Sequence, residues 1–192
     1  MNERRGHIGF ALCGSFCTVK RSLAVMRALR EDGWRITPIV SDAVYEWNTR
    51  FTDAAALRDE IEAICGEKIL HTVTQAEPLG PAVHLDALVI LPCTGNTLAK
   101  MAQGITDTAV TMAAKAQLRS CRPVVIGLAS NDALSANLHN IGTMLSRKQV
   151  YFVPLAQDDP EGKPHSLICK FDLAADTLRA ALEGKQLQPL LR

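Results

Sequence analysis

A group of small polar side chains follows the most apolar run of the sequence. Residues 87–91 are all hydrophobic, and Thr94, Asn96 and Thr97 come shortly after them. Hydroxyl and amide groups beside the amino terminus of a helix suit a phosphate or a polar heterocycle. Thr94 and Asn96 are also good N-cap residues for any helix, and the spacing alone favours this capping role.

A second polar group follows the apolar run 7–13. Gly14 permits a tight turn and a close backbone approach, and Ser15 and Thr18 place hydroxyls at the start of the next helical pattern. The spacing matches neither the GxGxxG fingerprint nor a Walker loop. A phosphate site and a plain helix cap therefore explain these residues equally well.

The elements that must position these groups alternate along the chain. Apolar strands are predicted at 7–13, 35–40, 68–73, 87–91, 122–129 and 150–154, and helices at 19–31, 53–65, 98–103, 107–119, 133–145 and 172–182. This alternation predicts an α/β protein with a Rossmann-like, doubly wound, mostly parallel sheet and helices on both faces. We expect one domain that spans residues 1–192.

Four predicted strands end in polar residues. Besides the two groups above, Ser41 follows the run 35–40, and Ser130 and Asn131 follow the run 122–129. Ligands of doubly wound sheets bind in the crevice outside the carboxyl ends of the strands. Four such ends together favour a ligand site over four unrelated caps.

Composition excludes several classes of function. The 192 residues carry a formal net charge of +1 and no long basic run, so nucleic acid and anionic membranes are not expected partners. No apolar stretch has the length of a membrane span, and the amino terminus is too short for a signal peptide, which predicts a cytoplasmic protein.

The six cysteines form no CxxC pair and no Cys/His spacing for zinc, so we expect no metal site and reduced thiols. Cys13 and Cys93 differ from the others because each lies near a strand end, where a site could form. A buried structural thiol is the commoner outcome for such residues.

The segment from Pro92 to Lys100, followed by residues 104–107, resembles the Pro-Ala-Ser-Ala-Asn-Thr region of the flavin-dependent cysteine decarboxylase and flavin prenyltransferase superfamily. The resemblance extends from the Gly14-Ser15 loop to Val153. Within the superfamily, segments 127–132 and 157–160 are most similar to the branch that contributes to dipicolinate synthases.

The resemblance implies a homo-oligomer, commonly trimer-based, that binds flavin mononucleotide (FMN) near a subunit interface. By position, the residues that match the family's cofactor-binding groups are Gly14, Ser15, Ser41, Thr94, Asn96, Thr97 and Ser130. Asn131 matches the asparagine of the decarboxylases' Pro-x-Met-Asn motif, whose first three residues are replaced by 128–130. Asn96 and Asn131 are the residues expected to orient the flavin ring or the substrate during catalysis.

Two departures argue against the sister chemistries. Pro78 occupies the position of the decarboxylases' catalytic histidine, and residues 127–130 lack the prenyltransferases' arginine. His71 and His84 are neighbours, but each is more typical of a hydrogen-bonded histidine at a layer boundary than of a general base.

The dipicolinate branch implies a partner. There, a separate dehydrogenase-like A subunit that uses NAD(P) acts with this type of chain to form pyridine-2,6-dicarboxylate (dipicolinate) from a hydroxy-tetrahydropyridine dicarboxylate, in the mother cell of a sporulating bacterium. Lys100, Arg119 and Arg147 are candidate cations for the small dicarboxylate, although each also fits a solvated helix residue. The alternatives are a non-catalytic scaffold of the flavin family and an FMN-dependent decarboxylase-like or prenyltransferase-like enzyme with a displaced base.

Overall fold

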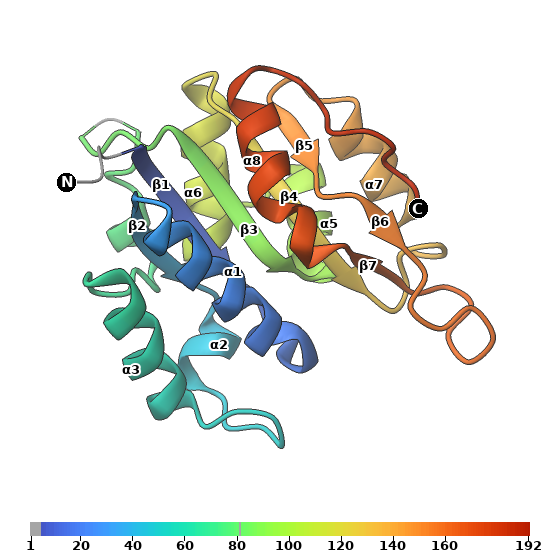
Figure 1. Cartoon of the computed structure of the whole chain (residues 1–192), viewed down its shortest axis with the longest axis horizontal. Coiled ribbons are helices and arrows are strands. Elements are labelled where there is room, and N and C mark those ends of the chain that lie inside the picture. Colours follow the sequence, from blue (N-terminus) through green and yellow to red (C-terminus); the bar gives the residue numbers. More distant parts are fainter. Residues whose placement is uncertain (1–4, 81) are drawn as a thin grey trace.

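The computed structural model describes residues 5–80 and 82–192 and is centred on a seven-stranded sheet (Figure 1). The strands follow the order β2-β1-β3-β4-β7-β6, and β5 also pairs with β4. Their bounds are β1 Gly6–Leu12, β2 Trp34–Val40, β3 Ala87–Cys93, β4 Val124–Ser130, β5 Val150–Phe152, β6 Leu155–Ala156 and β7 Leu167–Cys169.

Parallel pairing dominates the sheet. β1 pairs in parallel with β2 and β3, β3 with β4, and β4 with β5. The order β2-β1-β3-β4-β5 is that of a doubly wound, flavodoxin-like sheet, in which ligands bind beside the strand ends where the order reverses. The predicted Rossmann-like α/β fold is therefore confirmed.

Helices cover both faces of the sheet (Figure 1). α1 and α8 pack on one face, while α5, α6 and α7 pack on the other, with α4 against α6. The helix bounds are α1 Val19–Glu31, α2 Asp42–Glu46, α3 Ala54–Cys65, α4 Val73–Ala76, α5 Gly95–Gln103, α6 Ala109–Arg119, α7 Leu138–Leu145 and α8 Ala174–Leu182, with short 3₁₀ turns at η1 Phe16–Thr18 and η2 Phe171–Leu173.

The central strand β3 has all seven residues buried. Because both faces of a parallel sheet are covered, its strands lose the alternation of a half-exposed strand and become continuously apolar. The strand continues through Pro92, whose carbonyl oxygen accepts a 3.0 Å hydrogen bond from the Cys13 backbone N–H. This bond holds the ends of β1 and β3 side by side.

Residues 68–73 do not form the predicted third strand. Only Leu70 bridges to the sheet, opposite Ile39. The chain turns away directly because Thr72 caps α4, with its side chain accepting from the Gln75 N–H and the Gln75 side chain accepting from the Thr72 N–H. This capping box satisfies amide groups that would otherwise pair in a sheet.

The helix predicted at 133–145 is also shorter than expected, because α7 begins only at Leu138. Residues 131–137 form turns in which Asp132 accepts the Asn137 side-chain amide and the Leu134 N–H donates to the His165 carbonyl oxygen at 2.9 Å. These tertiary bonds replace the first helical turns.

The antiparallel pair β6 and β7 was not predicted. β7 pairs with Ala129 and Ser130 of β4, beyond the part of β4 that the three-residue strand β5 reaches. The hairpin therefore covers the free edge of β4 and brings its connecting loop, residues 157–166, to the carboxyl end of the sheet (Figure 1).

No helix among the described residues is long and apolar enough to span a membrane. The same residues contain no group of three or more His, Cys, Asp or Glu side chains that could hold a metal ion.

Candidate functional site

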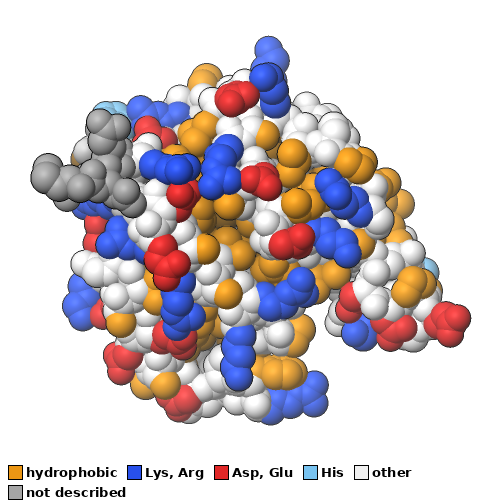
Figure 2. Space-filling view, in the orientation of Figure 1, with side chains coloured by type: hydrophobic (Ala, Val, Ile, Leu, Met, Phe, Trp, Pro, Cys, Tyr) orange, Lys and Arg blue, Asp and Glu red, His pale blue; other side chains and the backbone are white. Residues whose placement is uncertain are grey.

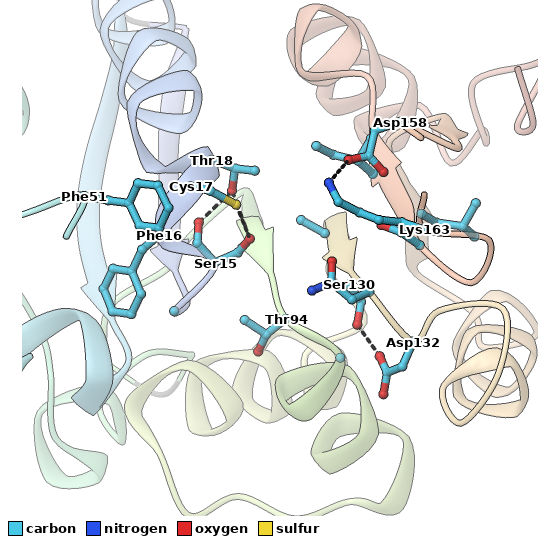
Figure 3. Close-up of a pocket in the computed structure, with 17 residues that line it drawn as sticks. Ser15, Phe16, Cys17, Thr18, Phe51, Thr94, Ser130, Asp132, Asp158 and Lys163 are labelled. Carbon is cyan, nitrogen blue, oxygen red and sulfur yellow. Dashed lines mark hydrogen bonds and ion pairs between the residues drawn. The ribbon is translucent and has the colours of Figure 1, made fainter. Parts of the chain in front are cut away.

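A pocket of about 490 Å³ lies at the carboxyl ends of β1, β3 and β4 (Figure 3). The space-filling view shows the surface hollowed between the projecting loop of the β6–β7 hairpin and the rest of the molecule (Figure 2). The pocket is lined by Gly14, Ser15, Phe16, Cys17, Thr18, Phe51, Thr94, Gly95, Ala129, Ser130, Asn131, Asp132, Asp158, Lys163, Ser166, Leu167 and Ile168.

The loop after β1 forms the first wall. The Thr18 hydroxyl donates to the Ser15 carbonyl oxygen at 2.8 Å and lies 3.2 Å from the Ser15 hydroxyl. In the described part of the chain, the backbone N–H groups of Phe16 and Cys17 donate no hydrogen bond. Two free amides beside two hydroxyls are the donor set that an anionic phosphate requires.

Thr94 forms the floor of the pocket and also caps α5. Its hydroxyl accepts from the Thr97 N–H at 3.3 Å, so the capping role expected from the sequence is real. The same residue lines the pocket, which means that the capping and ligand-site interpretations are compatible. Thr97 itself is buried and donates its hydroxyl to the Cys13 sulfur at 3.3 Å.

The end of β4 contributes a fixed carboxylate. The Ser130 hydroxyl donates to Oδ1 of Asp132 at 2.5 Å, and the Asn137 side-chain amide donates to Oδ2 at 2.8 Å. Asn137 is buried and in turn accepts from the Asn140 amide at 2.9 Å. Two donors from different directions therefore orient Asp132 at the pocket wall.

Several functional groups escaped the sequence analysis because they come from distant segments. Lys163 and Asp158 lie on the hairpin loop and form an ion pair of 3.3 Å across from Ser15 (Figure 3). Burial opposes ionisation of Asp158, but the Ser166 hydroxyl and the Lys163 ammonium group outweigh it and lower the pKa of this carboxyl. Phe16 and Phe51 add two aromatic rings to the opposite wall.

The sequence predicted residues 157–164 only as a polar loop. Nothing in that segment indicated that it would lie across the pocket from the loop after β1. The rings of Phe16 and Phe51 carried no signal beyond their hydrophobicity.

The structure brings together five of the eight residues predicted for the site. Gly14, Ser15, Thr94, Ser130 and Asn131 line the pocket. The other three do not: Asn96 is exposed on α5, Thr97 is buried behind the pocket, and the Ser41 hydroxyl is buried after β2 without a hydrogen-bond partner in the described residues. Ser41 starts α2 and lies two residues before Ala43, whose side chain adjoins Gly14.

The two cysteines near strand ends are structural. Burial raises the pKa of Cys13 to about 11, and burial likewise raises the pKa of Cys93 well above its ordinary value. Both thiols therefore stay protonated at neutral pH and make poor nucleophiles. Cys17 is the exposed cysteine of the pocket wall.

The candidate histidines lie elsewhere. The His71 ring stacks on Tyr45, with 3.6 Å between ring centroids, and neither His71 nor His84 lines the pocket. Among the three candidate cations, Lys100 pairs with Asp107 at 2.8 Å. Arg119 and Arg147 line a separate cavity of about 320 Å³ at α5 and α6.

The sheet defines an α/β protein of flavodoxin-like strand order, and its carboxyl-edge pocket combines aromatic walls with a loop whose donors suit a phosphate. The model of the family described as Flavoprotein matches residues 1–183. The chain is 43% identical to the dipicolinate synthase B subunit of Bacillus subtilis (strain 168), with coverage of 100% of this chain and 96% of that protein. The chain therefore belongs to the Flavoprotein family and, within it, to the family of dipicolinate synthase B subunits.

Solved structures agree with this assignment. The dipicolinate synthase B subunit from Bacillus halodurans has a TM-score of 0.91 and 42% identity, with 100% of this chain and 98% of that chain covered. The FMN-dependent cysteine decarboxylase SpaF has a TM-score of 0.65 and 24% identity, with 93% and 96% covered, and shows the shared fold. The resemblance to the superfamily seen in the sequence is thus confirmed.

Proposed function

We propose that this chain is the B subunit of a dipicolinate synthase, binds FMN in the carboxyl-edge pocket, and acts as an oxidoreductase subunit together with a dehydrogenase-like A subunit that carries NAD(P). The full-length 43% identity to a dipicolinate synthase B subunit is the observation that carries the proposal. The pair would form pyridine-2,6-dicarboxylate from a hydroxy-tetrahydropyridine dicarboxylate in the mother-cell cytoplasm of a sporulating bacterium. A trimer-based homo-oligomer is the assembly that the family resemblance favours.

The pocket residues fit FMN. The hydroxyls of Ser15 and Thr18, with the free amides of Phe16 and Cys17, would hold the phosphate. The buried Ser41 hydroxyl, two residues before the Ala43 side chain that adjoins Gly14, is a further polar group without a partner in the described chain. A volume of about 490 Å³ lies within the usual range for cofactor pockets.

The flat ring system of a flavin needs apolar contacts and a few polar edges. Phe16 and Phe51 offer aromatic faces, and Leu167 and Ile168 offer aliphatic ones. Thr94, at the floor of the pocket, supplies a polar group for the ring edge. When bound, flavin supplies a two-electron acceptor for the substrate.

The substrate carboxylates need donors. Lys163 is the one cation among the described residues that line the pocket, and the exposed Asn131 amide is a neutral donor at the same wall. We infer that Lys163 attracts the dicarboxylate and that Asn131 orients it. This is the substrate-orienting role that the resemblance implies for Asn131.

A non-catalytic scaffold is the second candidate, and the position of Pro78 favours it. Proline has no exchangeable proton, and no histidine lines the pocket in the described residues. The free donors of the β1 loop argue for retained ligand binding in either case.

Flavin retention tests the cofactor. Purified protein supplied with FMN should keep visible flavin absorbance after desalting, and Ser15→Asp should weaken FMN binding by about 100-fold, because a carboxylate then faces the phosphate. Aspartate is a good N-cap residue, so the fold should tolerate the change at the start of η1. Thr74→Asp is the matched control: it adds the same charge at the exposed first turn of α4, outside the pocket. Colourless wild-type protein without calorimetric FMN binding would contradict the flavin assignment.

Reconstitution tests the partner. We expect little dipicolinate from this chain alone and clear production after the A subunit and NAD(P) are added. Robust synthesis by the isolated chain would contradict the two-subunit proposal. Full activity of the A subunit alone, unchanged by this chain, would contradict both the two-subunit proposal and the scaffold candidate.

A further inference from the structure

The carboxylate of Asp132 is an acidic group of the pocket that hydrogen bonds hold in one orientation. Each of its two oxygens accepts one hydrogen bond, from the Ser130 hydroxyl at 2.5 Å and from the Asn137 amide at 2.8 Å. The Asn137 backbone N–H also donates to the Asp132 carbonyl oxygen at 3.1 Å. A carboxylate has about four acceptor positions, so two remain available to a molecule in the pocket.

Buried groups support this carboxylate from behind. Asn137 is 6% exposed and Asn140 is 4% exposed, and the Asn140 amide donates to the Asn137 side-chain oxygen. The Asn137 oxygen is thereby occupied, which orients its amide nitrogen toward Asp132. An exposed aspartate that only stabilises a turn does not need buried hydrogen-bond partners of this kind.

Because Gly95 has no side chain, the hydrogen-bonded side chains of Ser130, Asp132 and Asn137 can pack directly against its backbone. A Cβ atom at residue 95 would lie 2.5 Å from the Asn137 amide nitrogen, 2.5 Å from the Ser130 hydroxyl and 2.9 Å from Oδ1 of Asp132. Cβ contacts shorter than 3.0 Å force atoms to shift. The superfamily motif has alanine where this chain has Gly95, so the glycine and the Asp132 network fit each other.

The proposed reaction requires a proton acceptor. Conversion of a hydroxy-tetrahydropyridine dicarboxylate into an aromatic pyridine removes one water molecule and, separately, a hydride with a proton. Water loss is not a redox step, and it needs a base at the ring carbon next to the hydroxyl-bearing carbon.

We propose that Asp132 is this base, an assignment that rests on the proposed function. Its carboxylate takes the ring C–H proton, the C–H electron pair becomes a ring double bond, and the C–O bond breaks with its pair on oxygen. The departing oxygen takes a proton from solvent and leaves as water, and Asp132 then returns its proton to solvent. Bound flavin, or NAD(P) on the A subunit, would supply the hydride acceptor for the later oxidation.

The other pocket groups are less suited to this step. Asp158 is paired with Lys163, and the lowered pKa of Asp158 makes it a weaker base. Cys13 is buried and stays protonated. No histidine lines the pocket in the described residues.

The test follows water loss directly. Mass spectrometry measures the dehydrated product from the hydroxylated substrate, with the flavin-loaded chain and with the chain plus the A subunit. Asp132→Ala should lower the rate by at least about 100-fold, the usual contribution of a general base. Added formate should restore part of the rate, because a small carboxylate can fill the space, whereas a purely structural defect would not respond.

Matched variants make the outcome decisive. Asp158→Ala removes the other carboxylate of the pocket and should show no formate rescue. If Asp132→Ala melts early, the nearly isosteric Asp132→Asn takes its place in the assay. Gly95→Ala keeps the carboxylate but displaces it, and should lower the rate of the FMN-loaded protein by at least about tenfold.

The outcomes separate this proposal from the proposed function. Asp132→Ala or Asp132→Asn that folds, keeps FMN and loses water as fast as the parent would overturn the role of Asp132 alone. Wild-type protein that neither removes water nor supports dipicolinate formation with the A subunit would overturn the proposed function, and this inference with it.

Discussion

The two edges of the sheet carry similar kinds of side chain but use them differently. At the amino edge, the His7 ring nitrogen lies 2.8 Å from the Thr37 hydroxyl, which donates to Glu67 at 2.9 Å. Arg35 donates to the other oxygen of Glu67 at 2.6 Å, and Asp86 accepts the His7 N–H at 2.8 Å. The side chains of His7, Arg35, Thr37 and Glu67 bond to one another, while the buried Trp34 indole N–H at the start of β2 has no partner among the described residues.

At the carboxyl edge, hydroxyls, carboxylates and a lysine surround an open volume. The backbone N–H groups of Phe16 and Cys17, two residues that line this volume, donate no hydrogen bond within the described chain. The histidine, the arginine and the two carboxylates of the amino edge therefore have a structural role. The hydroxyl groups and free backbone amides of the carboxyl edge indicate a ligand site. Unsatisfied groups around a cavity, rather than residue type, distinguish the two.

The largest effect on stability should come from the amino edge. Glu67→Ala leaves Arg35 and Thr37 without their acceptor and should lower the free energy of unfolding by about 1–3 kcal/mol. FMN affinity of the folded protein should not change, because the pocket lies at the opposite edge. Urea denaturation and FMN titration measure the two quantities.

Glu60→Ala is the control for Glu67→Ala. It breaks the exposed pair of Arg27 and Glu60, which should be worth less than about 1 kcal/mol. A Glu67→Ala variant that is as stable as Glu60→Ala would show that the amino-edge network is not structural, and the comparison of the two edges would fail.

A smaller effect should appear in the pH dependence of stability. Burial and the Arg35 charge lower the pKa of His7 from 6.5. Burial of Glu67 acts in the opposite direction, but the hydrogen bonds from Arg35 and Thr37 outweigh it and lower its pKa from 4.5. For both groups the folded state binds fewer protons than the unfolded state, so their stabilisation is present above these ordinary values and is lost as the pH falls.

Thermal unfolding between pH 7.5 and 4 measures this loss. Stability should begin to fall below about pH 6.5 and fall further below about pH 4.5. His7→Gln should remove the first part of the decline, while a change at the exposed His139 of α7 should leave it in place. An unchanged profile in His7→Gln would contradict the assigned contribution of His7.

Much of the fold was predictable because buried parallel strands and amphipathic helices leave strong local patterns. The helix predicted at 19–31 matches α1, and the run 87–91 marks the core of β3. The rule that ligands bind at carboxyl strand ends placed Ser15, Thr94 and Ser130 in the same pocket. These inferences needed only the order of elements along the chain.

The remaining features depend on contacts between distant residues. Strands β6 and β7 have two and three residues, too few for an alternating pattern, so the loop that carries Lys163 had no predicted position. Residues 133–136 favour a helix locally, but the bond from the Leu134 N–H to His165 holds a turn instead. The direction of the Ser41 hydroxyl is likewise set by packing.

The smallest effect on stability should come from Asn131, at the rim of the pocket. The residue is exposed, and α7 begins at Leu138 with Asn137 at its N-cap position, so Asn131 caps no helix, contrary to the structural alternative suggested by the sequence. Asn131→Ser and Asn131→Asp should each change the free energy of unfolding by less than about 0.5 kcal/mol.

Activity with the A subunit should respond to the same two changes. Loss of the amide donor to a charged carboxylate costs about 1.5–3 kcal/mol, so KM for the dicarboxylate should rise at least about tenfold in Asn131→Ser. Asn131→Asp should raise it further because like charges then meet. Asn96→Ser is the matched change at an exposed asparagine outside the pocket lining. A similar rise in KM in this variant would support the site role that the resemblance assigns to Asn96. Undiminished activity in both Asn131 variants would remove Asn131 from the site and leave Lys163 as the substrate contact at this wall.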